Sequence, residues 1–514
     1  MKTFSKTLVA ALIPLSPLFA LTDVYFGPGD WEADTPTQSA IPLYSDSGLT
    51  NRITDNSPEA LAGYNIIFNN YKMGNDLLAQ WGRTADSYTL GALTFTGYDN
   101  GNWHRFQTYG DKDTIVINTV GDITYKDNYW LNEDGSKNYG ANIWLGYNIK
   151  SVNVGGNFVV ENSKGWLGTN FPDVKTPGKA TVAGNVELKG DYAAFHTAVG
   201  QRKYQGGGSE DAQMGTFDNP DLDIGGYVDF GNSGEKYWVY NNSWISGGDV
   251  RSFGMQAYIK LGGLKGAGNI VSSGYTSESK TVFAFNVAAG QSFDFKGVIN
   301  AESASYTPMD TTDTADIEIR NAATGVQTLR LGMNGDAGFT GNVTVYSGTL
   351  FYGNADYLRK DADHNNLVIN GGNFGAAASD APVSGLDIGD AYFNNIEWNG
   401  GKILVDIESL SSIDVIFADT LSGSADVFEF VFNYDGDWAD LQDLRIANFF
   451  DVGSLSDEQI SKFLISDAYN RYYGWFEQVQ GGYEFMYAAV PEPAAVAALF
   501  GALALAFAAY RRRK

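Results

Sequence analysis

The residues of this chain with the greatest capacity for chemistry are carboxylates. The 514 residues contain no cysteine, and the three histidines are far apart, at His104, His196 and His364. There is no His-Glu-x-x-His zinc motif and no Gly-x-Ser-x-Gly nucleophile turn. A site that cleaves polysaccharides would need carboxylates or basic groups that converge on one groove. The acidic turns Asp435–Asp437 and Asp361–Asp363 also fit solvated turns, so we expect no catalytic residue.

One acidic segment has the spacing of a metal loop. Asp361, Asp363 and Asn365 place oxygen donors at alternate positions, as at the start of a calcium-binding loop. The later glycine and the bidentate glutamate of such a loop do not follow. We therefore expect no cofactor, with Ca²⁺ at these three residues as the alternative.

Composition narrows the class of partner. The net charge is −26, and a strongly acidic surface repels nucleic acid, which we exclude as a partner. Aromatic residues make up 14% of the chain and there are 61 glycines. Disordered chains lack aromatic residues, so this body is expected to fold, with short strands joined by tight turns.

The elements that must position these residues are strands. Apolar and polar residues alternate in many short runs, and Gly-Gly or Gly-Asn pairs interrupt them, as in residues 152–160, 180–188, 222–230 and 367–374. This unit favours a β-solenoid, in which turns stack, inward residues are buried, glycines form corners and asparagines form ladders. Antiparallel β-sandwich domains use similar turns and remain the alternative.

Two segments carry a resemblance. Residues 261–270 and 339–350 resemble the strand repeats of autotransporter passenger domains. Asn269 and Asn342 stand where the repeat usually has threonine. The resemblance covers residues 260–375 and implies a right-handed parallel β-helix. It implies no translocator barrel, because the chain ends instead in the sorting tail described below.

The chain divides into five expected regions, of which residues 1–20 and 490–514 are the two terminal segments described below. Residues 21–110 are less regular and form an N-terminal cap, and residues 111–410 form the solenoid. Residues 411–489 form a C-terminal β cap. In this cap Ser456 and Gln459 predict a capping box at the start of a short helix that runs to about Asp467. Two closing strands follow.

The N-terminus predicts export. Lys2 and Lys6 precede an apolar run from Leu8 to Ile13, and Ala20 is a suitable cleavage residue. Residues 1–20 therefore read as a signal peptide, too short to span a membrane.

The C-terminus predicts sorting. Pro491, Glu492 and Pro493 precede an uncharged apolar run from residue 494 to residue 510, which would be a transmembrane helix. The basic residues Arg511, Arg512, Arg513 and Lys514 would stop it at the cytoplasmic side. This order resembles the PEP-CTERM sorting signal of Gram-negative bacteria. The resemblance implies transient anchoring in the inner membrane and processing by an exosortase-like transpeptidase. An ordinary C-terminal anchor is the alternative.

These observations together predict an exported protein of the cell surface or extracellular matrix, with a structural, adhesive or glycan-contacting role. Exopolysaccharide or surface glycans are the expected partners besides the transpeptidase. A polysaccharide-degrading hydrolase or lyase on a β-helix is the main alternative, and a surface-layer subunit is a third. Six tryptophans in or beside short strands are candidates for sugar stacking or for the core: Trp103, Trp130, Trp144, Trp166, Trp238 and Trp244.

Overall fold

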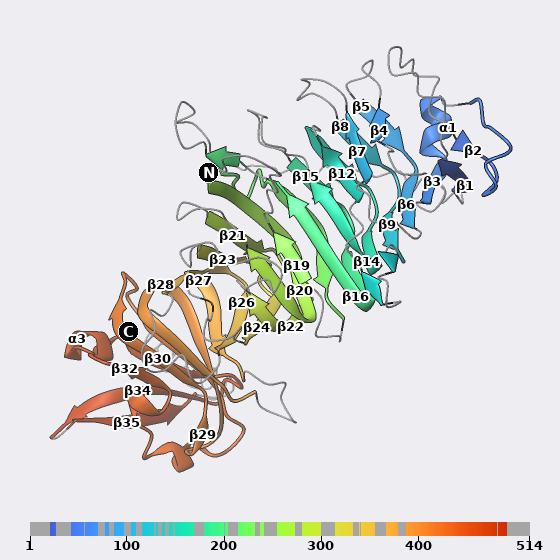
Figure 1. Ribbon diagram of the computed structural model, residues 1–514. Helices are drawn as coiled ribbons and strands as arrows, with labels where there is room; N and C mark the ends of the chain where they lie inside the picture. Colours follow the sequence, from blue (N-terminus) through green and yellow to red (C-terminus); the bar gives the residue numbers. More distant parts are fainter. Residues whose placement is uncertain are drawn as a thin grey trace, which may run out of the picture.

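The protein is all-β. The computed structural model describes residues 21–26, 43–55, 57–69, 78–81, 87–96, 104–108, 116–127, 130–131, 136–138, 143–147, 150–168, 179–199, 201–203, 214–231, 237–240, 254–272, 280–299, 314–332, 339, 341–354, 366–378, 387–480 and 482–490. All but two of the numbered strands belong to one 33-stranded sheet. In Figure 1 the strands follow one another in chain order along an elongated body.

Strands pair in parallel with the next strand of the same series, and the first series runs from end to end. It consists of β1 (Thr22–Phe26), β3 (Tyr64–Asn69), β6 (Ala92–Thr96), β9 (Ile123–Lys126), β14 (Phe158–Gly168), β16 (Val186–Ala198), β18 (Leu222–Asp229), β20 (Gly254–Ser272), β22 (Ser292–Ile299), β24 (Val326–Leu331), β26 (Thr349–Asn354), β27 (Leu367–Ala376), β28 (Asp390–Ser409), β31 (Phe428–Asn433) and β33 (Phe463–Asp467).

A second parallel series forms another face. It consists of β5 (Ser87–Leu90), β8 (Val116–Thr119), β13 (Ser151–Val154), β15 (Lys179–Val182), β18, β20, β21 (Lys280–Phe285), β23 (Thr314–Arg320), β25 (Val343–Ser347), β27, β28, β30 (Val415–Ser422) and β32 (Phe450–Val452). The strands β18, β20, β27 and β28 belong to both series, because they are long enough to pass through the corner.

A third, shorter series covers the N-terminal half. It consists of β4 (Leu78–Trp81), β7 (His104–Thr108), β12 (Ile143–Tyr147), β14, β16, β19 (Tyr237–Tyr240) and β20. The remaining elements are β2 (Leu43–Tyr44), α1 (Pro58–Ala62), β10 (Trp130–Leu131), β11 (Lys137–Asn138), β17 (Gln201–Lys203), β29 (Ser412–Ile413), the 3₁₀ turns η3 (Trp438–Leu441) and η4 (Ile446–Asn448), α3 (Asp457–Ser461), β34 (Tyr472–Val479) and β35 (Gly482–Ala489).

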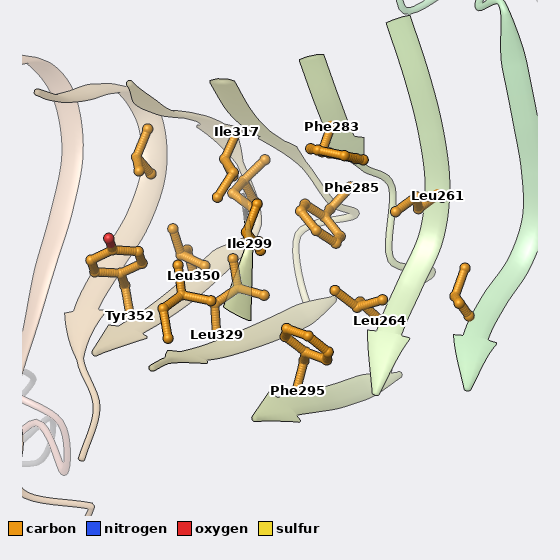
Figure 2. Close-up of a cluster of buried hydrophobic side chains, with 14 of the residues drawn as sticks. Leu261, Leu264, Phe283, Phe285, Phe295, Ile299, Ile317, Leu329, Leu350 and Tyr352 are labelled. Atoms are coloured by element: carbon orange, nitrogen blue, oxygen red, sulfur yellow. The ribbon is translucent and has the colours of Figure 1, made fainter. Parts of the chain in front are cut away.

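The core is a set of in-register columns. One column passes through Ile224, Leu261, Phe285, Ile319, Val345, Ile369 and Trp398 on seven successive strands of the second series, and each of these side chains is buried. Figure 2 shows part of this packing, with Leu261 and Phe285 close to residues of the first series such as Leu264 and Phe295. Because alternate residues of a strand point to opposite faces, the alternating pattern places one apolar residue of every pair in these columns.

Glycine is required at some corners. Gly401 has φ +87°, and a Cβ there would lie 2.0 Å from the carbonyl oxygen of Gly372 on the neighbouring strand. Both the left-handed backbone and the close approach exclude a side chain. Side-chain oxygens complete other corners: the Asp122 carboxylate accepts from the backbone N–H of Asn157, and the Asn157 side-chain amide oxygen accepts from that of Asn185.

The pairing direction decides between the two expected fold classes. Among the described strands, antiparallel pairs are confined to β1–β2, β10–β11, β17–β20, β28–β29, β33–β34 and β34–β35. An antiparallel sandwich is therefore wrong for the strands that the structure describes. Parallel pairing begins at β1, within residues 21–110, and continues to β33, within residues 411–489.

The C-terminal end confirms one local prediction and corrects another. Ser456 and Gln459 form the capping box of α3. The helix ends at Ser461 rather than near Asp467, because Phe463–Asp467 pairs in parallel with β31. The two closing strands are β34 and β35. Within the described part of the chain, no helix has the length and apolar character needed to cross a membrane.

Candidate contact surfaces

Most site residues expected from the sequence lie outside the described residues. This holds for the cleavage residue Ala20, the sorting motif Pro491–Pro493, the basic end Arg511–Lys514, and the calcium candidates Asp361, Asp363 and Asn365. Within the described ranges, no group of three or more His, Asp or Glu side chains is arranged to hold a metal ion.

The acidic turn at Asp435 and Asp437 has a structural role. The Asp437 side chain accepts from the backbone N–H of Ala439 at 3.0 Å and caps η3. The backbone oxygen of Asp435 accepts from Arg471 at 3.2 Å. Neither contact brings the two carboxylates together on a substrate, so the turn interpretation fits this pair.

The segment Met214–Asp221 lies over the outer face of the second series. Met214 and Phe217 pack against Tyr258 on β20 and against Val282 and Ala284 on β21. Asp221 holds the segment in place, because one carboxylate oxygen accepts from the backbone N–H groups of Gly215 and Tyr258, both at 2.9 Å. Burial raises the pKa of Asp221.

Charged groups surround Phe217, and we call the set the Phe217 cluster: Phe217, Tyr258, Lys260, Glu318, Arg320 and Tyr346. Glu318 accepts from the Tyr258 hydroxyl at 2.6 Å and from Nε of Arg320 at 2.8 Å. The cation of Arg320 lies 3.6 Å from the ring centre of Tyr346 and 5.2 Å from that of Phe217.

Lys260 completes the Phe217 cluster from β20, the strand that also carries Tyr258. Its Nζ lies 5.1 Å from the Phe217 ring centre and 3.2 Å from Asp223. Burial, followed by the hydrogen bond to Glu318, raises the pKa of the Tyr258 hydroxyl above its ordinary value of 10.0. The hydroxyl therefore stays protonated at neutral pH and acts as a donor. The cluster joins charged and aromatic side chains of three strands, β20, β23 and β25, to Phe217 and so fixes the covering segment to the sheet.

A second surface lies at the C-terminal end, and we call it the aromatic patch: Leu464, Tyr473, Trp475 and Met486. Trp475 is paired with Met486 across β34–β35. The rings of Tyr473 and Trp475 are 5.8 Å apart. Tyr473 is 42% exposed and Leu464 is 37% exposed. Sequence reasoning missed this patch, although the alternation Tyr473-Gly474-Trp475 signals two aromatic side chains on one face of a strand.

Among the six candidate tryptophans, Trp166 is not part of such a surface. Trp166 is buried, and its ring centre lies 4.3 Å from that of His196 on the adjacent strand. The side chains of the other five candidate tryptophans lie outside the described residues. His196 is buried, and burial followed by the charge of Lys164 lowers its pKa well below 6.5. It is therefore neutral at pH 7.

Comparison with known proteins does not assign this chain to a family. No protein-family model matches this chain, and no curated protein matches it either. The strand series and the side chains on its surface are therefore the basis for the proposed function.

Proposed function

We propose that this chain is an exported structural or adhesive protein of the cell surface or extracellular matrix, and that its body is a right-handed parallel β-helix. The observation that carries the proposal is the parallel pairing from β1 to β33. A stack of this kind grows by adding turns and presents a long, repetitive outer face. Repetition allows many weak contacts to act together.

The aromatic patch supports glycan contact within this role. Tyr473 is exposed, Trp475 is half-buried, and their rings stack on one another; aromatic side chains combine apolar contact area with a polar atom. The proposed ligand is a polysaccharide of the cell surface or matrix.

The proposed route to the surface rests on the two ends of the sequence. In a Gram-negative host that carries an exosortase-like transpeptidase, we expect the full chain to be cleaved and released. Replacing Pro491, Glu492 and Pro493 by alanine should leave an unprocessed membrane form, whereas the exposed Glu484→Gln should be processed normally. Equal processing of both variants would refute the sorting signal.

The proposed ligand class is tested separately. The protein is screened for retention on a panel of immobilised polysaccharides. For a polysaccharide that binds, Tyr473→Ala/Trp475→Ala should weaken binding about tenfold, as loss of about 1.4 kcal/mol of contact energy predicts. Tyr469→Ala is the matched control, because Tyr469 is exposed but bonds to Asn433 outside the patch. Cleavage of any polysaccharide would instead favour the hydrolase or lyase alternative.

A further inference from the structure

A lysine and an asparagine on neighbouring turns touch through their side chains. Nζ of Lys179, the first residue of β15, is in direct contact with Oδ1 of Asn219. The backbones around them are tied together, since the N–H of Ala180 donates to the carbonyl of Asp221 at 3.0 Å. Asn219 is also held by its own turn, in which it exchanges two backbone hydrogen bonds with Thr216.

A buried carboxyl group lies beside this contact. Asp221 is two residues from Asn219 and only 1% exposed. Its Oδ2 accepts from two backbone N–H groups, those of Gly215 and Tyr258, which fixes the orientation of the carboxyl group. Lys179 and Asp221 are neighbours across two paired strands, because the residues that follow them, Ala180 and Leu222, are register partners. Burial raises the pKa of Asp221, and the charge of Lys179 acts in the opposite direction.

An amine, a carboxamide and a buried acid are the three groups needed to form an amide between side chains. We propose that Lys179 and Asn219 are a site of spontaneous covalent cross-linking, assisted by Asp221. The proposal does not depend on the proposed function, because it concerns the chemistry of one pair of turns.

The reaction balances without any other reagent. The carboxylate of Asp221 takes a proton from the Lys179 ammonium group, and the freed Nζ attacks Cγ of Asn219 and forms a C–N bond. Asp221 gives this proton to the amide oxygen, takes the second proton from the attacking nitrogen and passes it to the departing Nδ2, and the proton on the oxygen returns to Asp221 as the carbonyl re-forms. The bond between Cγ and Nδ2 breaks and ammonia leaves. Nothing is oxidised or reduced, and the chain loses the mass of one ammonia.

The cross-link would fasten the covering segment Met214–Asp221 to the edge of β15. It would join residues that are 40 positions apart and restrict the unfolded chain in the manner of a disulfide. In a chain without cysteine, this is a covalent means of stabilising the outer face.

Peptide mass spectrometry of the full-length chain tests the proposal. Trypsin cannot cut after a modified Lys179. We expect a branched peptide that joins residues 176–189 to residues 204–236, lighter than the sum of the two by one ammonia. Finding Lys179 cleaved and both peptides unmodified in the folded protein would overturn the cross-link.

Three variants define the roles of the residues. Lys179→Arg keeps the charge but cannot form the amide, and Asp221→Asn keeps the acceptor oxygen but removes the acid. Both should give only linear peptides while circular dichroism shows a folded protein. Lys126→Arg, at a surface ion pair with Glu161, should retain the full cross-link. A cross-link that persists in Asp221→Asn would overturn the role given to Asp221.

Discussion

Asn153 on β13 donates from its side-chain amide to the side-chain oxygen of Asn118 on the paired strand β8, at 2.9 Å. Thr181 on β15, the strand paired with β13 on its other side, donates to Asn153 at the same distance. These residues occupy one register position of β8, β13 and β15. The ladder shows how the outer face of the parallel series is held: each polar residue is satisfied by its equivalents above and below.

Removing the middle residue of this ladder should destabilise the protein. Asn153→Ala leaves the oxygen of Asn118 and the hydroxyl of Thr181 without this partner, and two modest hydrogen bonds are lost. We expect the free energy of unfolding to fall by about 1–3 kcal/mol, measured by urea denaturation. Glu458→Gln is the control, because the Glu458 side chain is 82% exposed in its pair with Lys462 and should change stability by under about 0.5 kcal/mol. Equal effects would contradict a structural role for the ladder.

Two glycines separate backbone strain from crowding. Gly290 has φ +74° with nothing near its missing Cβ, whereas Gly401 has φ +87° and a carbonyl oxygen 2.0 Å from that position. Gly290→Ala should cost only the left-handed conformation, about 1–2 kcal/mol. Gly401→Ala should cost that and a further ~1–3 kcal/mol from displaced backbone. Urea midpoints of the two variants provide the comparison, and a Gly401 variant no less stable than the Gly290 variant would contradict the corner geometry.

Local patterns predicted much of the fold, since its regularity is local. The alternation in residues 222–230 predicts which residues enter the core, and Ile224 indeed joins the column with Leu261 and Phe285. The Ser456–Gln459 capping box is likewise confirmed, because both partners lie within one turn of chain.

Contacts between segments that are far apart in the chain could not be predicted from the sequence. Phe217 packs on the cluster of Tyr258, Val282 and Ala284, which joins a loop to two strands that are far from it in the sequence. The end of α3 at Ser461 was also missed, because pairing with β31 overrides the helical pattern. Of the candidate surfaces, the Phe217 cluster depends on such contacts, and the aromatic patch depends on which face of β34 is outermost.

Arg330 should be one of the most sensitive charged residues. Its side chain is 5% exposed; Nε contacts both oxygens of Asp294 at 3.0 and 3.1 Å, and the guanidinium also binds Asp387 and the carbonyl of Ala378. Arg330→Met removes the cation that pairs with Asp294 and Asp387. Because the remaining carboxylates are then unpaired, we expect the free energy of unfolding to fall by about 3 kcal/mol.

A double-mutant cycle identifies the cause of that loss. Adding Asp387→Asn to Arg330→Met should recover part of the stability, since an amide tolerates the missing cation better than a carboxylate does. Lys402→Met is the control, because Lys402 forms a more exposed pair with Glu429 and should cost under about 1 kcal/mol. Strict additivity in the Arg330–Asp387 cycle would show that the two side chains are not coupled.

His196 should make the stability depend on pH below neutrality. Its folded pKa lies well below 6.5, first because of burial and second because of Lys164. As the pH falls below about 6.5, the unfolded chain binds a proton at this position that the folded chain does not, so stability declines by at most about 1.4 kcal/mol per pH unit. The contribution is fully present above pH 6.5.

The pKa of Asp414 is raised well above 3.8, mainly by burial, so Asp414 gives a slope of the opposite sign that starts above pH 3.8. The contribution of His196 must therefore be taken as a difference between two proteins. His196→Phe removes the titrating group but keeps a ring against Trp166. Urea midpoints between pH 5 and 8 should fall more steeply toward acid in the wild type than in the variant. Parallel curves would show that His196 binds its proton equally in the folded and unfolded chains.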